Sequence, residues 1–431
     1  MTLTRLTAAL LLAASAVTAS ADEWTLDRCI AYAIDNNIDV RTRSLQISSA
    51  ELEVDDARNR FLPTAQGYAS QNFNFGRALT MDNTYANRNT SNFAAGAQLS
   101  LPLFQGLGAV RRMGYAKANL AAVLEQAEAA KDDVTLNVIS GYLQALYTSE
   151  LSAVARERVA MSRRELERTQ ALVDEGRLPE LDLCQAQAQL SQDELSAVRA
   201  ANDSTLALLD LSQILNLPAD ADFRIRPLDD SLPPLMTADE VFEAAMARNH
   251  TIRAAELQTE AAERNVSVAK TGYIPTLSFS AGLGTNYYHT SGINNESFGG
   301  QMRHNFSQSV GFSLSVPIFD AFATRNSVRR ARIESENARL RLDDARMQLY
   351  KAINQAYTQA LGAARQREAT AAALTSARAA YDAMTVKYDN GRANATELEK
   401  AKSDYTNAMA ESVRSRYELI LRSRILSFYA K

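Results

Sequence analysis

The hexapeptide LSLPLF at residues 99–104 recurs as LSVPIF at residues 314–319, an offset of 215 residues. The tetrapeptide DEGR at residues 174–177 recurs as DNGR at residues 389–392, at the same offset of 215 residues. Chance matches do not keep one offset over such a distance, so these pairs indicate an internal repeat. The sequence therefore predicts a chain in which one structural unit is written twice.

The two repeats are expected at about residues 22–217 and 236–431. The stretch between them, 218–235, contains four prolines and is expected to be a linker. Proline is absent from residue 318 to the last residue, 431, and glycine is rare, with 17 of 431 residues. Because a proline inside a helix costs about 3 kcal/mol, these spans favour long uninterrupted helices.

Each repeat is expected to contain a short helix, a medium helix, two strands joined by a polar loop, a very long helix and a closing helix. The expected helices are 26–36, 38–60, 105–175 and 179–215 in the first repeat, and 238–248, 251–271, 320–390 and 394–428 in the second. A long helix of this kind can pair with its shorter partners in antiparallel coiled-coil hairpins. The turns at Gly176 and Gly391 would then lie at the hairpin tips.

Four short segments alternate between apolar residues and small or polar ones, as strands with one apolar face do. These strands are expected at about 64–75, 92–103, 276–287 and 307–318, although the first alternates poorly at Gln71. The polar stretches 76–90 and 289–306 are expected to be loops. Segments of about ten residues with this pattern suit transmembrane β-strands, but a half-buried sheet in a soluble domain has the same alternation.

Residues 1–21 have the features of a secretory signal peptide, in which Arg5 precedes an apolar core and Ala19-Ser20-Ala21 forms the cleavage site. We therefore expect an exported chain, and no later apolar run approaches the length of a membrane-spanning helix. Four strands are too few to close a barrel in lipid, where the edges of an open sheet would stay unpaired. If these strands cross a membrane, the chain must oligomerise, and three copies would supply twelve strands.

The composition argues against several functions. With 46 Lys and Arg against 50 Asp and Glu, the formal net charge of −4 does not favour a nucleic-acid partner. Two cysteines and three scattered histidines supply neither a disulfide framework nor a metal site. No nucleophile–histidine pairing or phosphate loop is present. We therefore expect no enzyme activity, cofactor or metal, and expect Cys29 and Cys184 to be free thiols.

The ordered set of these features resembles the TolC-like outer-membrane efflux protein family over essentially the whole mature chain. The resemblance rests on the duplicated element order, on the strand exits at 101–104 and 316–319, and on DLCQAQ at 182–187, which looks like the family's Asp-Leu-Leu-x-Ala-Gln. It implies a mixed α/β membrane protein made mainly of long α-helices. The implied assembly is a homotrimeric channel-tunnel with a 12-stranded outer-membrane β-barrel, four strands per chain, and a periplasmic α-helical barrel of coiled-coil hairpins.

The resemblance also implies a function and partners. Such a protein is the outer-membrane channel of a tripartite efflux or type I secretion system, and it conducts substrates from the periplasm or the inner-membrane transporter to the exterior. The implied partners are a periplasmic adaptor (membrane fusion) protein, a transporter of the RND, ABC or MFS type, and outer-membrane lipid. The expected location is the outer membrane, with the helical part in the periplasm.

The hairpin tips, at about 176–182 and 391–397, are the candidate site for gating and adaptor contact. By the resemblance, Asp182 and Glu397 match acidic gate positions and Tyr388 matches a gate tyrosine. Two positions depart from the family pattern, because Arg392 lies one position before the usual arginine and Lys400 replaces a second acidic residue. The residues expected at this site are Gly176, Arg177, Asp182, Tyr388, Asp389, Gly391, Arg392 and Glu397.

Helix capping explains several of these residues without a gate. Glycine adopts a positive φ without strain, so Gly176 and Gly391 are expected C-caps. Pro179 suits the first position of the next helix, and Asn394 with Glu397 has the spacing of a capping box. Capping and gating are compatible, since a cap can still face a lumen.

Two other functions remain open on the residues alone. A soluble periplasmic coiled-coil scaffold would use the same hairpins and make an ordinary sheet of the four strands. A secreted enzyme is the second alternative, although no catalytic motif supports it.

Overall fold

Helices make up most of the chain in the computed structural model, which describes residues 23–79, 83–218, 223–228 and 236–430. The signal peptide expected at 1–21 and part of the expected linker lie outside these ranges. No helix within the described ranges has an apolar run long enough to cross a membrane.

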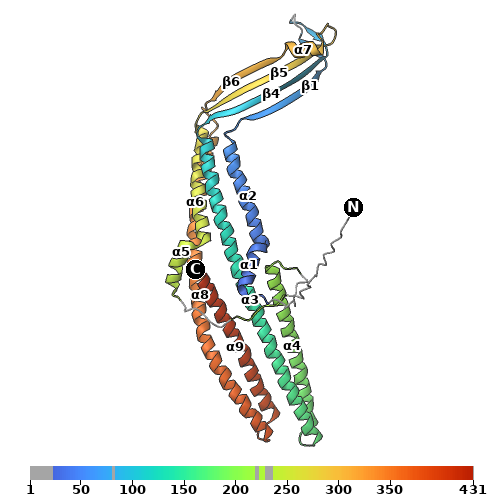
Figure 1. Ribbon diagram of the computed structural model, residues 1–431, viewed down its shortest axis with the longest axis vertical. Helices are drawn as coiled ribbons and strands as arrows, with labels where there is room; N and C mark the ends of the chain where they lie inside the picture. Colours follow the sequence, from blue (N-terminus) through green and yellow to red (C-terminus); the bar gives the residue numbers. More distant parts are fainter. Residues whose placement is uncertain (1–22, 80–82, 219–222, 229–235, 431) are drawn as a thin grey trace, which may run out of the picture. The chain divides into compact units, whose positions relative to one another are not determined.

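The two halves of the chain contain similar elements in the same order (Figure 1). The first half contains α1 (Leu26–Asn36), α2 (Ile38–Asn59), β1 (Thr64–Asn74), β2 (Arg77–Leu79), β3 (Tyr85–Asn87), β4 (Thr90–Gln105), α3 (Gly108–Asp174) and α4 (Glu180–Ile214). The second half contains α5 (Ala238–Arg248), α6 (His250–Ala269), the 3-10 helix η1 (Lys270–Tyr273), β5 (Thr276–Thr290), α7 (Phe298–His304), β6 (Ser307–Ser315), α8 (Ala323–Asp389) and α9 (Ala395–Ala430). The two stretches expected as loops therefore contain the β2–β3 pair and α7.

The long helices α3 and α8 each begin three residues later than expected, because two left-handed residues precede each of them. The φ angles are +59° and +62° at Gly106 and Leu107, and +52° and +65° at Ala321 and Phe322. Left-handed residues cannot continue into a right-handed helix, so they set its first residue. Strand β6 ends at Ser315 rather than at 318, close to Pro317, which has no N–H to donate to a ladder.

β1, β4, β5 and β6 form one antiparallel sheet in that order. The central strands β4 and β5 pair along their whole lengths, with one irregularity between Pro102 and Phe104. The outer strands β1 and β6 each have one neighbour within the described chain. Each outer strand therefore presents a free edge of backbone N–H and C=O groups.

The two faces of this sheet differ in chemistry. On one face, Leu101 pairs with Phe279, which in turn pairs with Phe312, and the two phenyl rings are 5.3 Å apart. Phe312 and its neighbours on this face of β6 are exposed. On the opposite face, Gly96 pairs with both Tyr68 and Gly284. An exposed apolar face of this size is suited to lipid or to another apolar surface rather than to water.

The described chain forms two compact units, and each contains segments from both halves. Unit 1 comprises the described residues of 1–41, 131–241 and 353–431, and unit 2 comprises those of 42–130 and 242–352. Unit 2 therefore holds the sheet, whereas unit 1 holds both hairpin turns. The helices α3 and α8 contribute residues to both units.

The core of unit 1 surrounds Tyr142, a fully buried residue of α3. Its hydroxyl group lies 2.9 Å from the carbonyl oxygen of Trp24 and 2.5 Å from that of Arg226. The backbone N–H of Arg226 also donates to the Trp24 carbonyl, at 3.0 Å. Tyr142 thus holds the first described residues and part of the linker against the long helix.

Both cysteines are free thiols, as expected. Cys29 is fully buried in the core of unit 1, and this burial raises the pKa of its thiol to about 12. Cys184 on α4 is exposed. Because the thiolate is the reactive form, Cys29 is poorly reactive at neutral pH.

Candidate functional site at the hairpin tips

The two hairpin turns have the same backbone geometry. Gly176 and Gly391 have φ angles of +70° and +65°. The N–H groups of Arg177 and Arg392 reach back to carbonyls five residues earlier, at Leu172 and Lys387, each at 2.8 Å. This is the Schellman C-cap, so the expected capping role of both glycines is confirmed.

The helices that follow the turns begin differently. In the second hairpin, the N–H of Asn394 donates to Glu397 Oε2 at 3.0 Å, and the N–H of Glu397 donates to Asn394 Oδ1 at 2.8 Å. This pair is the expected capping box. In the first hairpin, Pro179 is the N-cap rather than the first helical residue, because α4 begins at Glu180. Asp182 is half-buried in the first turn of α4.

Arg168 on α3 brings together two of the expected tip residues. Its guanidinium forms an ion pair with Asp389 at the end of α8, and it lies 5.4 Å from the centroid of the Tyr388 ring. The sequence offered no reason to single out Arg168. These contacts join the first hairpin, α3–α4, to the second hairpin, α8–α9, close to their turns.

The other expected tip residues are not brought together within one chain. Arg177 contacts Glu175 in its own turn, at 3.5 Å. Glu397 is occupied by its capping box. Within the described ranges, Asp182 and Arg392 make no side-chain ion pair or hydrogen bond to another expected tip residue. Capping is therefore the role that the geometry of one chain assigns to Glu397.

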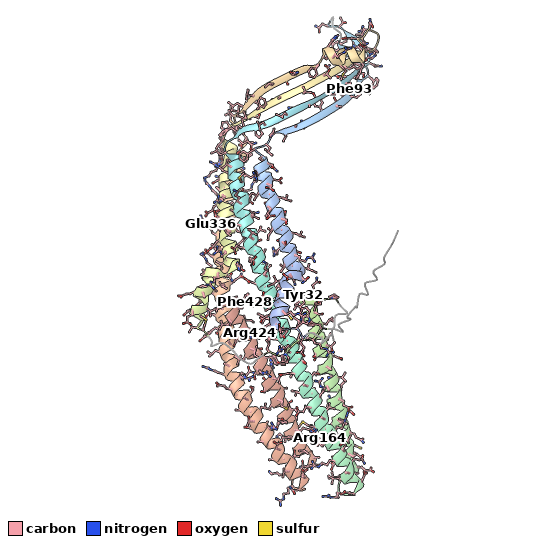
Figure 2. All side chains as sticks on the ribbon, in the orientation of Figure 1. Tyr32, Phe93, Arg164, Glu336, Arg424 and Phe428 are labelled. Carbon is pink, nitrogen blue, oxygen red and sulfur yellow. The ribbon has the colours of Figure 1, made fainter. Side chains whose placement is uncertain are left out.

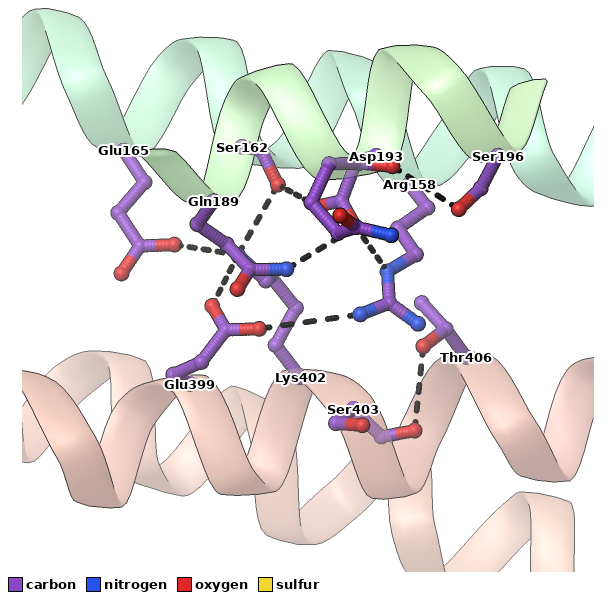
Figure 3. Close-up of polar contacts among 11 residues, drawn as sticks. Arg158, Ser162, Glu165, Gln189, Asp193, Ser196, Glu399, Lys402, Ser403 and Thr406 are labelled. Carbon is purple, nitrogen blue, oxygen red and sulfur yellow. Dashed lines mark hydrogen bonds and ion pairs between the residues drawn. The ribbon is translucent and has the colours of Figure 1, made fainter. Parts of the chain in front are cut away.

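A second connection between the hairpins, buried above the tips, was missed from the sequence. We call it the Lys402 cluster; its members are Arg158, Ser162, Glu165, Asp193, Glu399 and Lys402 (Figure 3). Lys402 on α9 donates to Glu165 Oε2 at 2.7 Å and to Ser162 Oγ at 3.0 Å, and it forms an ion pair with Glu399. The side chain of Lys402 is only 1% exposed.

The Lys402 cluster continues from α3 to α4. The Ser162 hydroxyl donates to Asp193 Oδ2 at 2.6 Å, and Arg158 Nε lies 2.8 Å from Asp193 Oδ1. Gln189 also donates to Asp193, at 3.0 Å. Ser162 therefore accepts from a cation on α9 and donates to an anion on α4, so three helices share one polar network.

The charges of the Lys402 cluster do not cancel, because two cations face three carboxylates. Burial by itself would lower the pKa of Lys402, but hydrogen bonds and Coulombic attraction from Glu165 and Glu399 outweigh it, so the pKa is raised. Burial raises the pKa of Glu399; contact with Lys402 opposes this rise, whereas Glu165 and Asp193 add to it. The cluster therefore holds a firmly charged lysine beside a carboxylate that protonates more readily than usual.

The helices α3 and α9 are joined again further from the tips. Arg416 on α9 lies 3.0 Å from Glu150 on α3, and the rings of Tyr147 and Tyr417 are 6.3 Å apart. Because α3 runs toward the turn and α9 runs away from it, these contacts and those of Lys402 follow one antiparallel register. The two hairpins are thus connected at several levels along unit 1.

A polar cavity of about 720 Å³ lies beside the Lys402 cluster, between the same helices. Asp182 lines it from α4, and Lys400 lines it from α9 together with Glu399 and Lys402. The expected acidic residue Asp182 therefore faces the same space as the lysine that departs from the family pattern. No group of three or more metal-ligating side chains gathers here or elsewhere in the described residues.

A comparison of the two repeats could have revealed the Lys402 cluster. At the offset of 215 residues, Arg158, Ser162, Glu165 and Asp193 correspond to Ala373, Ala377, Ala380 and Ala408. Polar residues that face alanine in the other copy mark positions where the two hairpins differ in their packing. The sequence signal was therefore the loss of symmetry and not any local motif.

Comparisons with known proteins agree on one family. The model of the outer membrane efflux protein family matches residues 29–217 and again residues 241–428. The outer membrane protein TolC of Vibrio cholerae serotype O1 is 24% identical over 425 residues, covering 96% of this chain and 92% of TolC. Protein CyaE of Bordetella pertussis is 27% identical over 73% of this chain, and the match spans 65% of CyaE.

Solved structures show the same fold. A membrane protein from Pseudomonas aeruginosa superposes with a TM-score of 0.78 and 20% identity, covering 94% of this chain and 92% of that one. CusC superposes with a TM-score of 0.79 and 16% identity, covering 94% and 91% of the two chains. The helices and strands described above therefore form a known channel fold.

The family match extends over both halves and includes both hairpin turns. It decides between the functions that the residues alone left open, because its members are outer-membrane proteins rather than soluble scaffolds or secreted enzymes. The chain belongs to the outer membrane efflux protein family, whose members are outer-membrane channels of efflux and secretion systems.

Proposed function

We propose that three copies of this chain form a passive conduit across the outer membrane. The observation that carries this proposal is the four-stranded sheet, with its exposed apolar face and its two free edges. A sheet in lipid must pair both edges, and one chain offers too few strands to close on itself. Three copies supply twelve strands, an even number within the range of outer-membrane barrels.

The periplasmic end of this conduit opens, in our proposal, when the two hairpins of each chain separate. The ion pair between Arg168 and Asp389 and the Lys402 cluster both cross from the first hairpin to the second. Separation must break these contacts, so they favour the closed state. Asp182, Tyr388, Arg392 and Glu397 remain the proposed gate residues, with Arg392 free to meet a carboxylate of a neighbouring copy.

The partners follow from the family. Relatives such as TolC and the alkaline protease secretion protein AprF belong to efflux and secretion systems that include an adaptor and an inner-membrane transporter. We infer that an adaptor docks at the hairpin tips and that a transporter of the RND, ABC or MFS type delivers the substrate. Outer-membrane lipid then surrounds the apolar face of the sheet.

The assembly is tested by the mass of the mature protein extracted in detergent from the outer-membrane fraction. We expect a particle near three times the mass of the chain. A monomer or dimer recovered from the soluble periplasm would overturn the conduit, because four strands per particle cannot form a closed barrel.

The gate is tested by conductance in a planar lipid bilayer. Arg168→Ala removes the contacts with Asp389 and Tyr388, and we expect it to raise the conductance of the closed channel without changing its assembly. Arg164→Ala is the matched control, since Arg164 is exposed one turn earlier on the same helix (Figure 2). Equal conductance of the two variants would count against the tip contact as part of the gate.

A further inference from the structure

The helices next to the two edge strands carry exposed apolar stripes. α2 leads into β1, and α8 follows β6 (Figure 1). Leu45 and Leu52 on α2, and Ile333, Leu340 and Met347 on α8, are spaced by seven residues. Each of these five side chains is between 59% and 72% exposed. A seven-residue apolar spacing on a helix is typical of a seam with another helix.

Both stripes lie opposite the faces that pack within the chain. On α2 the buried residues are Ala50 and Ala57, and on α8 they include Ala331 and Ala338. Leu52, Ile333 and Leu340 each follow a buried alanine by two positions, which is a rotation of about 200° around the helix. The chain's own fold therefore leaves these stripes uncovered.

The free edges of the sheet indicate what covers them. β1 and β6 each have one neighbour within the described chain, at opposite edges of the same sheet. If the β6 edge of one copy meets the β1 edge of the next, then α8 of the first copy lies beside α2 of the second. The two helices run in opposite directions relative to the sheet, so the seam is antiparallel. Such head-to-tail contacts generate a ring.

The stripes match in their depth from the sheet. Leu52 and Leu45 lie about 10 and 21 Å from the last residue of α2, at 1.5 Å per residue. Ile333 and Leu340 lie about 15 and 26 Å from the first residue of α8 on the same scale. The apolar side chains of the two helices therefore alternate along the seam, as interdigitating knobs do.

The charges beside the stripes are complementary. Asp55 and Asp56 follow Leu52 by three and four residues on α2, and Arg329 and Arg330 precede Ile333 by four and three residues on α8. All four are exposed, and none forms an ion pair within the described ranges. Further along α8, by contrast, Arg339 and Arg346 are already paired with acidic residues of α6.

We propose that α2 of one copy and α8 of the next form an antiparallel seam, held by these apolar stripes and by ion pairs between the Asp55–Asp56 and Arg329–Arg330 pairs. The occupant of each stripe is a second copy of this chain. This inference rests on the proposed function, since it assumes that copies close a ring, and it names the residues that hold the ring together below the sheet.

Disulfide crosslinking tests the seam in the full-length protein in outer membranes. The background carries Cys184→Ser and keeps Cys29, which is buried. Oxidation of Leu45→Cys/Leu340→Cys, or of Leu45→Cys/Ile333→Cys, is expected to give a ladder on denaturing gels that ends at the covalently closed trimer. Each single-cysteine variant is the matched control and is expected to stay monomeric, because a head-to-tail seam never brings Leu45 to another Leu45.

Charge exchange provides a test that does not depend on new thiols. Asp55→Arg/Asp56→Arg alone, or Arg329→Asp/Arg330→Asp alone, is expected to reduce the yield of trimer through like-charge repulsion. The four changes combined are expected to restore it. Failure of the combined variant to recover any trimer, when both pairs alone lose it, would overturn the ionic part of the seam.

The outcomes separate this inference from the proposed function. A trimeric mass in detergent without crosslinks from either cysteine pair would overturn the seam and leave the conduit standing. Crosslinks to a different protein would show that the stripes bind another partner and would also overturn the seam. Dimers from single-cysteine variants would indicate a face-to-face contact and would refute both ideas. A monomeric mass would refute the conduit itself.

Discussion

The Lys402 ammonium on α9 lies 2.7 Å from the Glu165 carboxylate on α3, although the two residues are 237 positions apart in the chain. This contact crosses from one hairpin to the other at a place where Lys402 is almost completely buried. The ion pair therefore depends on the two hairpins lying side by side. Any movement that separates them must either bring water to Lys402 or leave its charge unpaired.

Replacing Lys402 by methionine should weaken this connection, because it leaves Glu165 and Glu399 without their cation. We expect Lys402→Met to lower the free energy of unfolding of unit 1 by at most about 3 kcal/mol, since both carboxylates keep some contact with water. It should also raise the conductance of the closed channel. Thermal unfolding in detergent, followed by circular dichroism, and bilayer recordings would measure the two effects.

Lys400→Met is the matched control, because Lys400 is exposed two residues earlier on the same helix. An exposed lysine of this kind is expected to contribute less than about 0.5 kcal/mol. If both variants unfolded at the same temperature and conducted equally, the Lys402 cluster would not connect the hairpins in the way described here.

The raised pKa of Glu399 predicts a specific dependence on pH. Above the ordinary carboxyl pKa of 4.5, the folded chain holds a proton at Glu399 that the unfolded chain has already lost. The contribution of Glu399 to stability therefore falls as the pH rises from 4.5 through the raised pKa, and it is constant above that. The contribution of Lys402 is lost only above pH 10.5, because its pKa is also raised.

The measurement is the unfolding temperature of the native protein and of Glu399→Gln across the range from pH 4.5 to neutral. The native protein should lose stability relative to the variant as the pH rises, since glutamine does not titrate. Parallel profiles for the two proteins would contradict this assignment. Mild acid is therefore expected to leave the hairpin connection in place rather than open it.

Local rules predicted the tips well and the Lys402 cluster not at all. The capping box at Asn394 and Glu397 and the left-handed glycines at 176 and 391 depend on a few neighbouring residues, so their spacing is sufficient to identify them. Lys402 and Ser162 are 240 positions apart, and their contact depends on which faces of three helices meet. The spacing of charges along one helix does not contain that information.

The starts of the long helices show the same limit. Gly106 could have indicated a left-handed turn, but Ala321 at the equivalent position of the second repeat carries no such signal. Its conformation follows from the surrounding strand-to-helix connection, which both repeats share. Tertiary structure thus overrides the local preference of Ala321 and Phe322, as it did for the expected helix start at 320.

This shared turn predicts opposite effects for two substitutions. An alanine at φ +52° carries left-handed strain of about 1–2 kcal/mol, part of which Ala321→Gly would return as unfolded-state entropy. We expect Ala321→Gly to stabilise the protein by about 0.5–1 kcal/mol. Gly106→Ala should destabilise it, because the added Cβ would lie 2.6 Å from Ile274 Cβ in addition to the strain. Unfolding temperatures that moved in the same direction for both variants would contradict the equivalence of the two turns.

The polar face of the sheet supplies the last prediction, at Gly96. A Cβ added there would lie 2.5 Å from the carbonyl oxygen of Leu283 and 2.8 Å from the Tyr68 hydroxyl oxygen. Because a backbone carbonyl on the neighbouring strand cannot move aside cheaply, Gly96→Ala should lower the yield of folded oligomer. Gly67→Ala is the control, since its Cβ would meet nothing nearer than the Gly96 carbonyl oxygen, at 3.8 Å.

A double variant separates the two causes of the clash at Gly96. Tyr68→Ala removes the phenol but leaves the Leu283 carbonyl in place, so Tyr68→Ala/Gly96→Ala should recover only part of the folded oligomer on gels run without heating. Full recovery would show that the side chain of Tyr68, rather than the approach of β5, requires glycine at this position. A normal yield for Gly96→Ala alone would mean that β4 and β5 separate more easily than the pairing along their whole lengths implies.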